Sequence, residues 1–559
     1  MMRRRFQRTL WLLVTAGLLL GGCMGSGGGA EPVEEQPASA PPAGAPSADG
    51  TPQAESAAEP AAAKTAFDQP SRVYYEIFVR SFYDSDGDGI GDLNGVTEKL
   101  DYLTDLGVQG IWLMPVNPSP SYHGYDVTDY YGIHPDYGTL EDMKRLVEEA
   151  HKRDIRVLMD LVVNHTSVKH PWFIESAAGE DSAKRDWYVW ADEATKTGEG
   201  SATGASKAWH PKGDSYYLGA FWDGMPDLNF DHPDVRAEMI AVGRYWLNLG
   251  VDGFRLDAAK HIYDNVASDK NKPETKEKNV AWWQQFRAAM EAEKPGVTLI
   301  GEVWDTPAVV APYLDRAMSS AFNFELARRI LDMAKSESGS NLAFTLERIY
   351  ALYQEASGGA FADSIFLANH DQNRVMSVLG GNENHARTAA AVLLTLPGNP
   401  FLYYGEELGM QGMKPDEHIR EPLPWTADRS APGNTSWIVP KYVQDGAISA
   451  EALAAQPDSL YAHYKRLIAY RKTDRALHEG GIATFDLDQD GIESYVRATA
   501  DGETSLIVHN LSGDAQSVTL PASEGGQRFG TLAFATSEDA KIEGDALALP
   551  PYSTAVLKP

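Results

Sequence analysis

Three carboxylic acids in this sequence stand where an enzyme that breaks glycosidic bonds would need them. Asp257, Glu302 and Asp371 each follow a short apolar run of the kind found in buried parallel strands. In a barrel the carboxyl ends of such strands meet at one face, so these side chains can converge although they lie far apart in the chain. One carboxylate can then attack the anomeric carbon while a second, kept protonated, protonates the leaving oxygen. A single such Asp is more often a cap or an ion-pair partner, but three at one face favour catalysis.

The apolar runs that would position these carboxylates number eight, and amphipathic helical stretches separate them. Strands buried on both faces are apolar throughout instead of alternating with polar residues. Eight alternating strand–helix units predict the α/β fold class, as a (β/α)₈ TIM barrel. The predicted strands are Val73–Val79, Gly110–Met114, Arg156–Val163, Gly253–Asp257, Val297–Glu302, Ser320–Asn323, Ser364–Ala368 and Pro400–Tyr403.

The chain departs from the barrel pattern in two places. Residues 166–222 are rich in Trp, Gly, Lys and Ser, have weak periodicity and are too long for a βα loop. They predict an inserted domain after the third strand, on the catalytic face. Residues 476–559 alternate with period two and predict a C-terminal antiparallel β-domain, expected to be a sandwich. The barrel itself would then comprise residues 67–165 and 223–475.

The N-terminus has the composition of an export signal. In residues 1–22, four arginines precede an apolar run that is too short to span a bilayer comfortably. The run ends in LGGC, which resembles a bacterial lipobox and implies cleavage before Cys23 with a lipid on its sulfur. Residues 23–66 are mostly Ala, Pro, Gly and Ser and predict a disordered tether. We therefore expect an exported protein that is lipid-anchored to the cell membrane on its extracytoplasmic side.

The charge of the chain limits its partners. Asp and Glu total 79 against 49 Lys and Arg, which gives a formal net charge of −30. Such an acidic surface repels phosphates and disfavours nucleic-acid binding, whereas it suits cation binding and a neutral substrate. A single cysteine excludes a disulfide within the chain. We expect a monomer.

A second constellation alternates aspartates with glycines just after the first predicted strand. Such a loop can surround a hard cation with oxygen ligands, to which a backbone carbonyl contributes. The twelfth position of the loop is Gly95, where an EF-hand has Glu, so this is not an EF-hand. The predicted ligands are Asp84, Asp86, Asp88, the carbonyl of Ile90, and Asp92.

Short blocks around the three carboxylates resemble those of the α-amylase family of glycoside hydrolases. They are Asp160–His165 (DLVVNH), Gly253–His261 (GFRLDAAKH), Gly301–Trp304 (GEVW), Phe366–Asp371 (FLANHD) and Met225–Asn229 (MPDLN). The resemblance covers nearly the whole chain from Val73 onward. It implies the barrel, an inserted domain B, a C-terminal β-domain and a Ca²⁺ ion in the aspartate loop.

The resemblance also assigns roles to individual residues. It implies that Asp257 is the nucleophile, that Glu302 is the general acid/base and that Asp371 holds ring hydroxyls. Arg255 lies two residues before Asp257 and would keep that carboxylate ionised. A second family calcium site uses the residue that is Asn164 here. The other implied sugar-binding residues are His123, Tyr125, His165, Lys260, His261, His370, Asp416 and Arg420.

Three features indicate which members of this family the chain resembles most. The MPDLN block resembles the group between oligo-1,6-glucosidases and neopullulanases, which includes secreted α-amylases. Oligo-1,6-glucosidases usually carry QPDLN and a Val after the nucleophile, whereas this chain has Met225 and Ala258. A small residue at 258 leaves room for a 4-linked sugar, and Lys260 can donate hydrogen bonds to it. We therefore expect an α-amylase that hydrolyses internal α-1,4 bonds of starch and maltooligosaccharides with retention.

Several alternatives remain open. The enzyme could be neopullulanase-like, cyclomaltodextrinase-like, an exo-acting α-glucosidase or an oligo-1,6-glucosidase. A pair between Asp126 and Arg420 would block the non-reducing end and favour exo action. A sugar-binding lipoprotein without catalysis is a further alternative, but binding alone does not require the three carboxylates that this chain retains.

Overall fold

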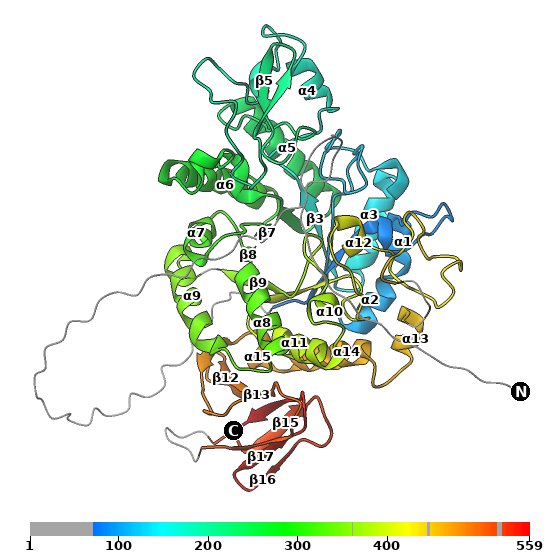
Figure 1. The fold of residues 1–559 in the computed structure, drawn as a ribbon, viewed down its shortest axis with the longest axis vertical. Coiled ribbons are helices and arrows are strands. Elements are labelled where there is room, and N and C mark those ends of the chain that lie inside the picture. Colours follow the sequence, from blue (N-terminus) through cyan, green and yellow to red (C-terminus); the bar gives the residue numbers. More distant parts are fainter. Residues whose placement is uncertain (1–70, 360, 444–445, 447, 522–527) are drawn as a thin grey trace, which may run out of the picture. The chain divides into compact units, whose positions relative to one another are not determined.

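Eight parallel strands close into a barrel in this computed structural model, which describes residues 71–359, 361–443, 446, 448–521 and 528–559 (Figure 1). The order around the barrel is β1-β10-β9-β8-β7-β6-β3-β2, and β1 closes it by pairing with both β2 and β10. Each strand coincides with one of the eight apolar runs of the sequence. Their bounds are Tyr74–Ile77 (β1), Gly110–Leu113 (β2), Arg156–Leu161 (β3), Gly253–Leu256 (β6), Thr298–Gly301 (β7), Ser320–Phe322 (β8), Ala362–Phe366 (β9) and Asn399–Tyr403 (β10).

Helices follow the strands and cover the barrel (Figure 1). Their starts are set by local chemistry: Thr139 and Asp142 form a capping box at α3, and Pro233 and Pro273 occupy the first positions of α5 and α6. The bounds are α1 Leu93–Glu98, α2 Leu100–Leu106, α3 Leu140–His151, α5 Pro233–Leu249, α6 Pro273–Glu293, α7 Pro307–Val310, α8 Phe324–Ser336, α9 Leu342–Ser357, α10 Val375–Val378, α11 Glu383–Thr395, α12 Asp416–Ile419, α13 Ala450–Ala454, α14 Leu460–Thr473 and α15 Arg475–His478.

The period-two alternation of the strands divides the barrel interior into an apolar layer and a polar layer. Tyr74, Leu158 and Ile300 belong to one buried cluster, in which the Tyr74 ring stacks on Phe401 at 4.7 Å. The residue two positions further along each strand points the same way, one layer nearer the carboxyl ends. These residues are polar: Glu76 in β1, Asp160 in β3 and Glu302 after β7.

The insertion predicted after the third strand is present. It contains α4 Pro171–Ser176 and an antiparallel hairpin of β4 Trp209–Lys212 with β5 Ser215–Leu218 (Figure 1). Its own small core joins Ala208, Trp209 and Leu218. Backbone bridges attach it to the barrel: Ser201 of the insertion pairs with Val266 after β6, and His165 pairs with Asp227 where the chain enters and leaves the insertion. The insertion is thereby fixed beside the carboxyl end of β3.

The C-terminal region is an antiparallel β-domain, as the alternation predicted. A five-stranded sheet has the order β11-β12-β13-β18-β15 and a three-stranded sheet the order β14-β17-β16, and one apolar cluster joins residues of both. Buried Arg497 ties this domain to the barrel by donating a hydrogen bond to the carbonyl of Thr395 at the end of α11. The strand bounds are β11 Gly481–Thr484, β12 Ile492–Ala498, β13 Thr504–Asn510, β14 Gln516–Thr519, β15 Thr531–Ala535, β16 Lys541–Glu543, β17 Ala546–Leu549 and β18 Thr554–Lys558.

The predicted signal at residues 1–22, the lipid acceptor Cys23 and the tether up to residue 66 lie outside the described residues. Within the part of the chain that the structure describes, no helix has the length and apolar character needed to cross a bilayer.

Candidate active site

One buried guanidinium gathers three carboxylates at the mouth of the barrel. Arg255 is 1% exposed, and its Nη1 lies 2.6 Å from Oδ1 of Asp257 and 2.9 Å from Oδ1 of Asp160. Its Nη2 lies 2.9 Å from Oε2 of Glu302. Asp257 and Glu302 are therefore held on two nitrogens of the same planar group, which fixes how far apart they are.

Protonation of this pair follows from burial and charge. Burial raises the pKa of both Asp257 and Glu302, while the Arg255 charge acts in the opposite direction. Two neighbouring carboxyl groups that share one cation do not both ionise readily. Asp257 makes the shorter contact with Arg255, so the arrangement suits an ionised Asp257 and a protonated Glu302. That division provides one nucleophile and one acid.

The third carboxylate has a different environment. Asp371 follows β9, and its carboxylate oxygens lie 2.9 Å from Nη2 of Arg420 and 3.1 Å from Nε2 of His370. Burial raises the pKa of Asp371, but the charges of His370 and Arg420 outweigh it and hold that pKa far below its ordinary value. Asp371 is therefore an anion that accepts hydrogen bonds.

His370 lies between two carboxylates. Its Nδ1 lies 2.5 Å from Oε1 of Glu76, and its Nε2 is within 2.7 Å of the Tyr125 hydroxyl. Burial lowers the pKa of His370, but Asp371 and Glu76 raise it more, to about 9. The ring is thus an imidazolium at neutral pH. Sequence reasoning missed Glu76, although a lone carboxylate inside an otherwise apolar strand was the available signal.

Tyr125 connects the two sides of this polar layer. Its hydroxyl donates to Oδ2 of Asp160 at 3.0 Å, and its ring stacks on His370 with centroids 5.4 Å apart. His123 is the next ring in the row, with its centroid 6.1 Å from that of Tyr125. Asp160 lies in the first sequence block but was not among the predicted site residues. Asp160 lies buried beneath the site, where its contacts with Arg255 and Tyr125 hold those two side chains in position.

The other two predicted histidines are neutral. Burial lowers the pKa of His165 and of His261 to about 4. His165 donates to the carbonyl of Tyr125 at 3.2 Å, and His261 donates to the carbonyl of Asp264 at 2.6 Å. Phe221 of the insertion contacts both rings. The insertion therefore lies over this side of the site.

Lys260 is engaged inside the protein. Its Nζ lies 2.7 Å from Oδ2 of Asp305 and 3.8 Å from Oδ2 of Asp264, and the residue is 5% exposed. Sequence reasoning expected this ammonium to donate to a sugar. Its position makes it an anchor for the loop that carries Glu302.

Ala258 adopts a left-handed backbone conformation, with φ of 45°. Its backbone N–H donates to Oε2 of Glu302 at 2.9 Å. A β-branched residue is strained at positive φ, so the backbone itself also favours a small residue here. A valine at 258 would change the backbone as well as the space available.

The hypothesis that Asp126 pairs with Arg420 is wrong. Arg420 instead contacts Asp371 and, at 3.3 Å, Asp416. Asp126 is buried and accepts hydrogen bonds from Ser119 and Ser121. The inferred block at the non-reducing end therefore loses its structural basis.

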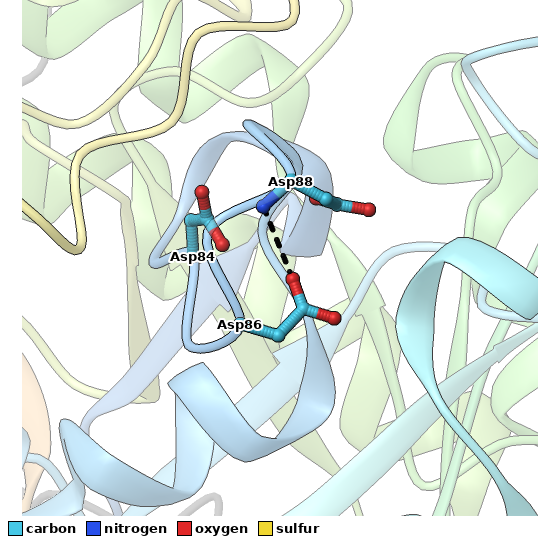
Figure 2. Close-up of side chains that lie close together, drawn as sticks. All are labelled: Asp84, Asp86 and Asp88. Carbon is cyan, nitrogen blue, oxygen red and sulfur yellow. Dashed lines mark hydrogen bonds between the residues drawn. The ribbon is translucent and has the colours of Figure 1, made fainter.

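The aspartate loop after β1 brings three side chains together (Figure 2). Oxygens of Asp84, Asp86 and Asp88 lie within 4.8 Å of one another, and this is the one such acidic group among the described residues. Asp84 accepts from the backbone N–H groups of Gly87 and Gly89, which holds the loop around the cluster. Three convergent carboxylates are suitable donors for a hard divalent cation.

The fourth predicted aspartate ligand of that loop, Asp92, has another role. Both oxygens of Asp92 accept hydrogen bonds from Ser85, and Oδ1 also accepts from the N–H of Gly95, which caps α1. Asp92 is not in the group formed by the other three.

Asn164, the residue implied in a second calcium site, lies beside Asp227. Its amide nitrogen donates to Oδ1 of Asp227 at 3.2 Å, while its own Oδ1 is buried without a partner. Burial raises the pKa of Asp227 to about 8. The described residues bring no cluster of three acidic or histidine ligands to this place.

Comparison with protein families matches two segments of the chain. Residues 76–480 match the model described as the catalytic domain of alpha amylase, and residues 492–556 match the model of the alpha-amylase SusG C-terminal domain. These segments coincide with the barrel and the C-terminal β-domain.

Individual relatives span nearly the whole described chain. It is 43% identical to alpha-amylase 3 of Dictyoglomus thermophilum over 487 residues, which is 87% of this chain and 93% of that protein. A crystal structure of alpha-amylase from H. orenii is 44% identical with a TM-score of 0.80, covering 88% of this chain and 99% of the other. A 4-alpha-glucanotransferase of Thermotoga neapolitana is 35% identical over 444 residues, 78% of this chain and 95% of that protein.

The pair of Glu76 and His370 gives a prediction about stability and pH. The pKa of His370 is raised to about 9 in the folded protein. Its contribution to stability is therefore complete below the unfolded value of about 6.5 and is lost as pH rises through about 9. We expect Glu76→Gln to lower the free energy of unfolding by about 1–2 kcal/mol at pH 6, and by much less at pH 10.

Urea unfolding of both proteins at the two pH values measures this difference. Glu325→Gln, at a half-exposed ion pair on α8, is the matched control and should change little at either pH. If Glu76→Gln lowers the free energy of unfolding equally at pH 6 and pH 10, the assignment of a charged His370 is contradicted.

Proposed function

This chain belongs to the α-amylase family of glycoside hydrolases and acts as an α-amylase, and we propose that it cleaves internal α-1,4 bonds of starch and maltooligosaccharides by double displacement. The observation that carries the proposal is the buried Arg255, which holds Asp257 and Glu302 on one guanidinium. A retaining mechanism needs two carboxyl groups this close, one charged and one protonated.

The residues of the site account for each step. Asp257 attacks the anomeric carbon while Glu302 gives its proton to the leaving glycosidic oxygen, so that a glycosyl ester forms on Asp257. Glu302 then takes a proton from water, which attacks the same carbon and releases Asp257 as a carboxylate. Asp371 accepts hydrogen bonds from ring hydroxyls, and charged His370 holds the Asp371 carboxylate in position from 3.1 Å. Tyr125 keeps His370 in place through the hydroxyl contact of 2.7 Å.

Endo action is supported by the contacts of Arg420. Its pairs with Asp371 and Asp416 leave Asp126 apart, so the pairing that would favour exo action is missing. Preference for α-1,4 bonds is supported by the small Ala258 beside Glu302. The relative described as a 4-alpha-glucanotransferase also points to α-1,4 chemistry.

Bond choice and stereochemistry give the test of this function. We expect kcat/KM on maltotriose and soluble starch to exceed that on isomaltose by at least about tenfold, because one pocket contact is typically worth about 1–3 kcal/mol. The first product should have the α-configuration by NMR. Glu302→Gln should lower kcat by about 10²–10⁴-fold, because it removes the proton donor.

Substitutions at residue 258 distinguish the effect of side-chain size on bond preference from the effect of backbone strain on stability. Ala258→Gly keeps the positive φ accessible and should retain the α-1,4 preference, whereas Ala258→Val should narrow it and also lower stability. Comparable kcat/KM values on isomaltose and maltotriose would favour the α-1,6-glucosidase alternative, and a β-configured first product would exclude double displacement.

We also propose that the loop of Asp84, Asp86 and Asp88 binds Ca²⁺. The proposal is supported by the convergence of their oxygens within 4.8 Å and by the backbone N–H groups that fix Asp84 (Figure 2). A bound calcium ion would add a positive charge that relieves repulsion among these carboxylates. Its role is structural, because the loop lies outside the catalytic contacts described above.

Calcium should therefore raise the melting temperature by mass action. At a concentration of 100 times Kd the stabilisation is about 2.7 kcal/mol, and chelation should remove it. Asp88→Asn should weaken the effect, because it removes one charge while its amide oxygen can still accept from the N–H of Ile90. Asp332→Asn, at an exposed ion pair on α8, is the control and should respond to calcium like the unmodified protein. An identical melting temperature with calcium and with chelator would disprove the site.

We propose, finally, that the mature chain is lipid-anchored through Cys23. The support is the order of arginines, short apolar run and LGGC, followed by a polar stretch with few large apolar residues. Expressed in a bacterium with its own N-terminus, the protein should partition into the detergent phase of Triton X-114. Cys23→Ser should move it to the aqueous phase, and an unchanged aqueous partition of both forms would contradict the anchor.

A further inference from the structure

A crevice separates the inserted domain from the segment between β6 and α6. Its volume is about 350 Å³, which falls in the range of about 300–1,000 Å³ that is typical of small-molecule sites. The insertion contributes Trp190 and Trp209 to its wall, and the segment after β6 contributes Tyr263 and Asn265. The residues that line the crevice take no part in the catalytic steps, so it is separate from the catalytic residues.

Hydrogen bonds fix the two walls of the crevice relative to each other. The carbonyl of Asn265 accepts from the N–H of Ala202 at 3.0 Å and from the hydroxyl of Ser201 at 3.2 Å, and both donors belong to the insertion. The N–H of Tyr263 donates to Oδ1 of Asn279, on α6, at 3.0 Å. A ligand therefore meets walls that are already in place, and its binding orders little of the protein.

The crevice wall combines aromatic surface with a free hydrogen-bond acceptor. Trp209 is 9% exposed and Tyr263 is half-buried, so parts of both rings are accessible. Asn265 is 6% exposed, and its Oδ1 has no hydrogen-bond partner among the described residues. A buried acceptor without a partner is unfavourable, and a donor from a ligand would satisfy it. Aromatic rings suit the apolar face of a sugar, and hydroxyl groups are suitable donors.

The charges at the crevice favour a neutral ligand. Asp231 and Asp269 both line it, and each is already paired with a lysine. The ammonium of Lys278 lies 2.9 Å from Oδ1 of Asp231, and that of Lys272 lies 2.9 Å from Oδ1 of Asp269. Their charges are offset, but a carboxylate has about four acceptor positions and one lysine does not fill them. A molecule with many hydroxyl groups therefore suits the crevice better than an organic cation or a phosphate.

We propose that the crevice between the insertion and the segment after β6 is a second, non-catalytic binding site for α-glucan chains. It would hold glucose units of a maltooligosaccharide or of starch against Trp209 and Tyr263, with hydroxyl groups donating to Asn265 and Asp231. This inference rests on the proposed function, because the neutral polyhydroxylated molecule that this enzyme meets is its own substrate.

A second site has a consequence that depends on substrate length. A long glucan that occupies the crevice raises the effective concentration of its remaining units near the catalytic residues, since both sites belong to one protein. A trisaccharide held in the crevice gives no such advantage, because it has no further units to present. The crevice should therefore lower KM for starch and leave maltotriose hydrolysis unaffected.

The experiment counts binding sites and then removes one of them. The probe is maltotriose with sulfur in place of both glycosidic oxygens, which Glu302 protonates poorly, so that the unmodified enzyme can be used. Calorimetric titration counts the bound molecules per chain, and competitive inhibition of maltotriose hydrolysis reports the catalytic site alone. The variants are Tyr263→Ala, Tyr263→Phe and Asp231→Ala. Tyr216→Ala is the matched control, because Tyr216 is a 40% exposed tyrosine of the insertion that does not line the crevice.

We expect two molecules of the probe per chain of the unmodified enzyme. Tyr263→Ala should weaken one site about tenfold and leave the inhibition constant at the catalytic site within about twofold. The same variant should raise KM for soluble starch at least about threefold, with kcat/KM on maltotriose within about twofold. Asp231→Ala should also weaken the crevice site. Tyr263→Phe, which keeps the ring, should retain binding, and Tyr216→Ala should match the unmodified enzyme.

Three results would overturn the inference. One is a single bound molecule of the probe per chain of the unmodified enzyme. Another is a second site whose affinity is the same in Tyr263→Ala and Asp231→Ala as in the unmodified enzyme. The third is an equal loss of maltotriose and starch hydrolysis in Tyr263→Ala, which would make Tyr263 a purely structural residue. Failure of the proposed function is distinguishable, because the unmodified enzyme would then cleave no starch, whatever number of sites the titration counts.

Discussion

The site depends on one constraint: three carboxylates in a buried barrel mouth are compensated by a single guanidinium. Removing a charge from water is costly, and here Arg255 offsets that cost for Asp160, Asp257 and Glu302 together. One cation cannot neutralise three anions, so a proton is retained within the set. Burial, together with the negative charge of Asp257, raises the pKa of Asp160 to about 7 even with Arg255 beside it. The same shortage of positive charge that makes the site costly to fold provides the protonated acid that catalysis requires.

Barrel geometry converts this constraint into a reactive arrangement. The layer that contains Tyr74, Leu158 and Ile300 seals the interior, and the next layer outward contains the charged residues. Each charged residue therefore packs against this apolar layer on one side, and solvent can approach it only from the carboxyl ends of the strands. This position raises the strength of every ion pair in the layer, because the local dielectric is low.

Loops then distinguish the two sides of the scissile bond. On the side that retains the sugar, Asp371 is surrounded by His370 and Arg420 and stays ionised. On the departing side, the ion pair of Lys260 with Asp305 fixes the loop that presents Glu302.

The sequence by itself determined the eight strands, the insertion, the C-terminal β-domain and the three carboxylates at the strand ends, because local apolar patterning specifies buried strands and barrel closure makes their ends meet. Only the tertiary structure decided the partners. It joined Glu76 to His370, which are 294 positions apart, and placed Lys260 against Asp305 instead of leaving it free for a sugar. It separated Asp126 from Arg420 and put Ala258 at positive φ. Partners of this kind depend on side-chain direction and on neighbouring strands in the closed barrel, and neither is encoded in the local pattern of a single strand.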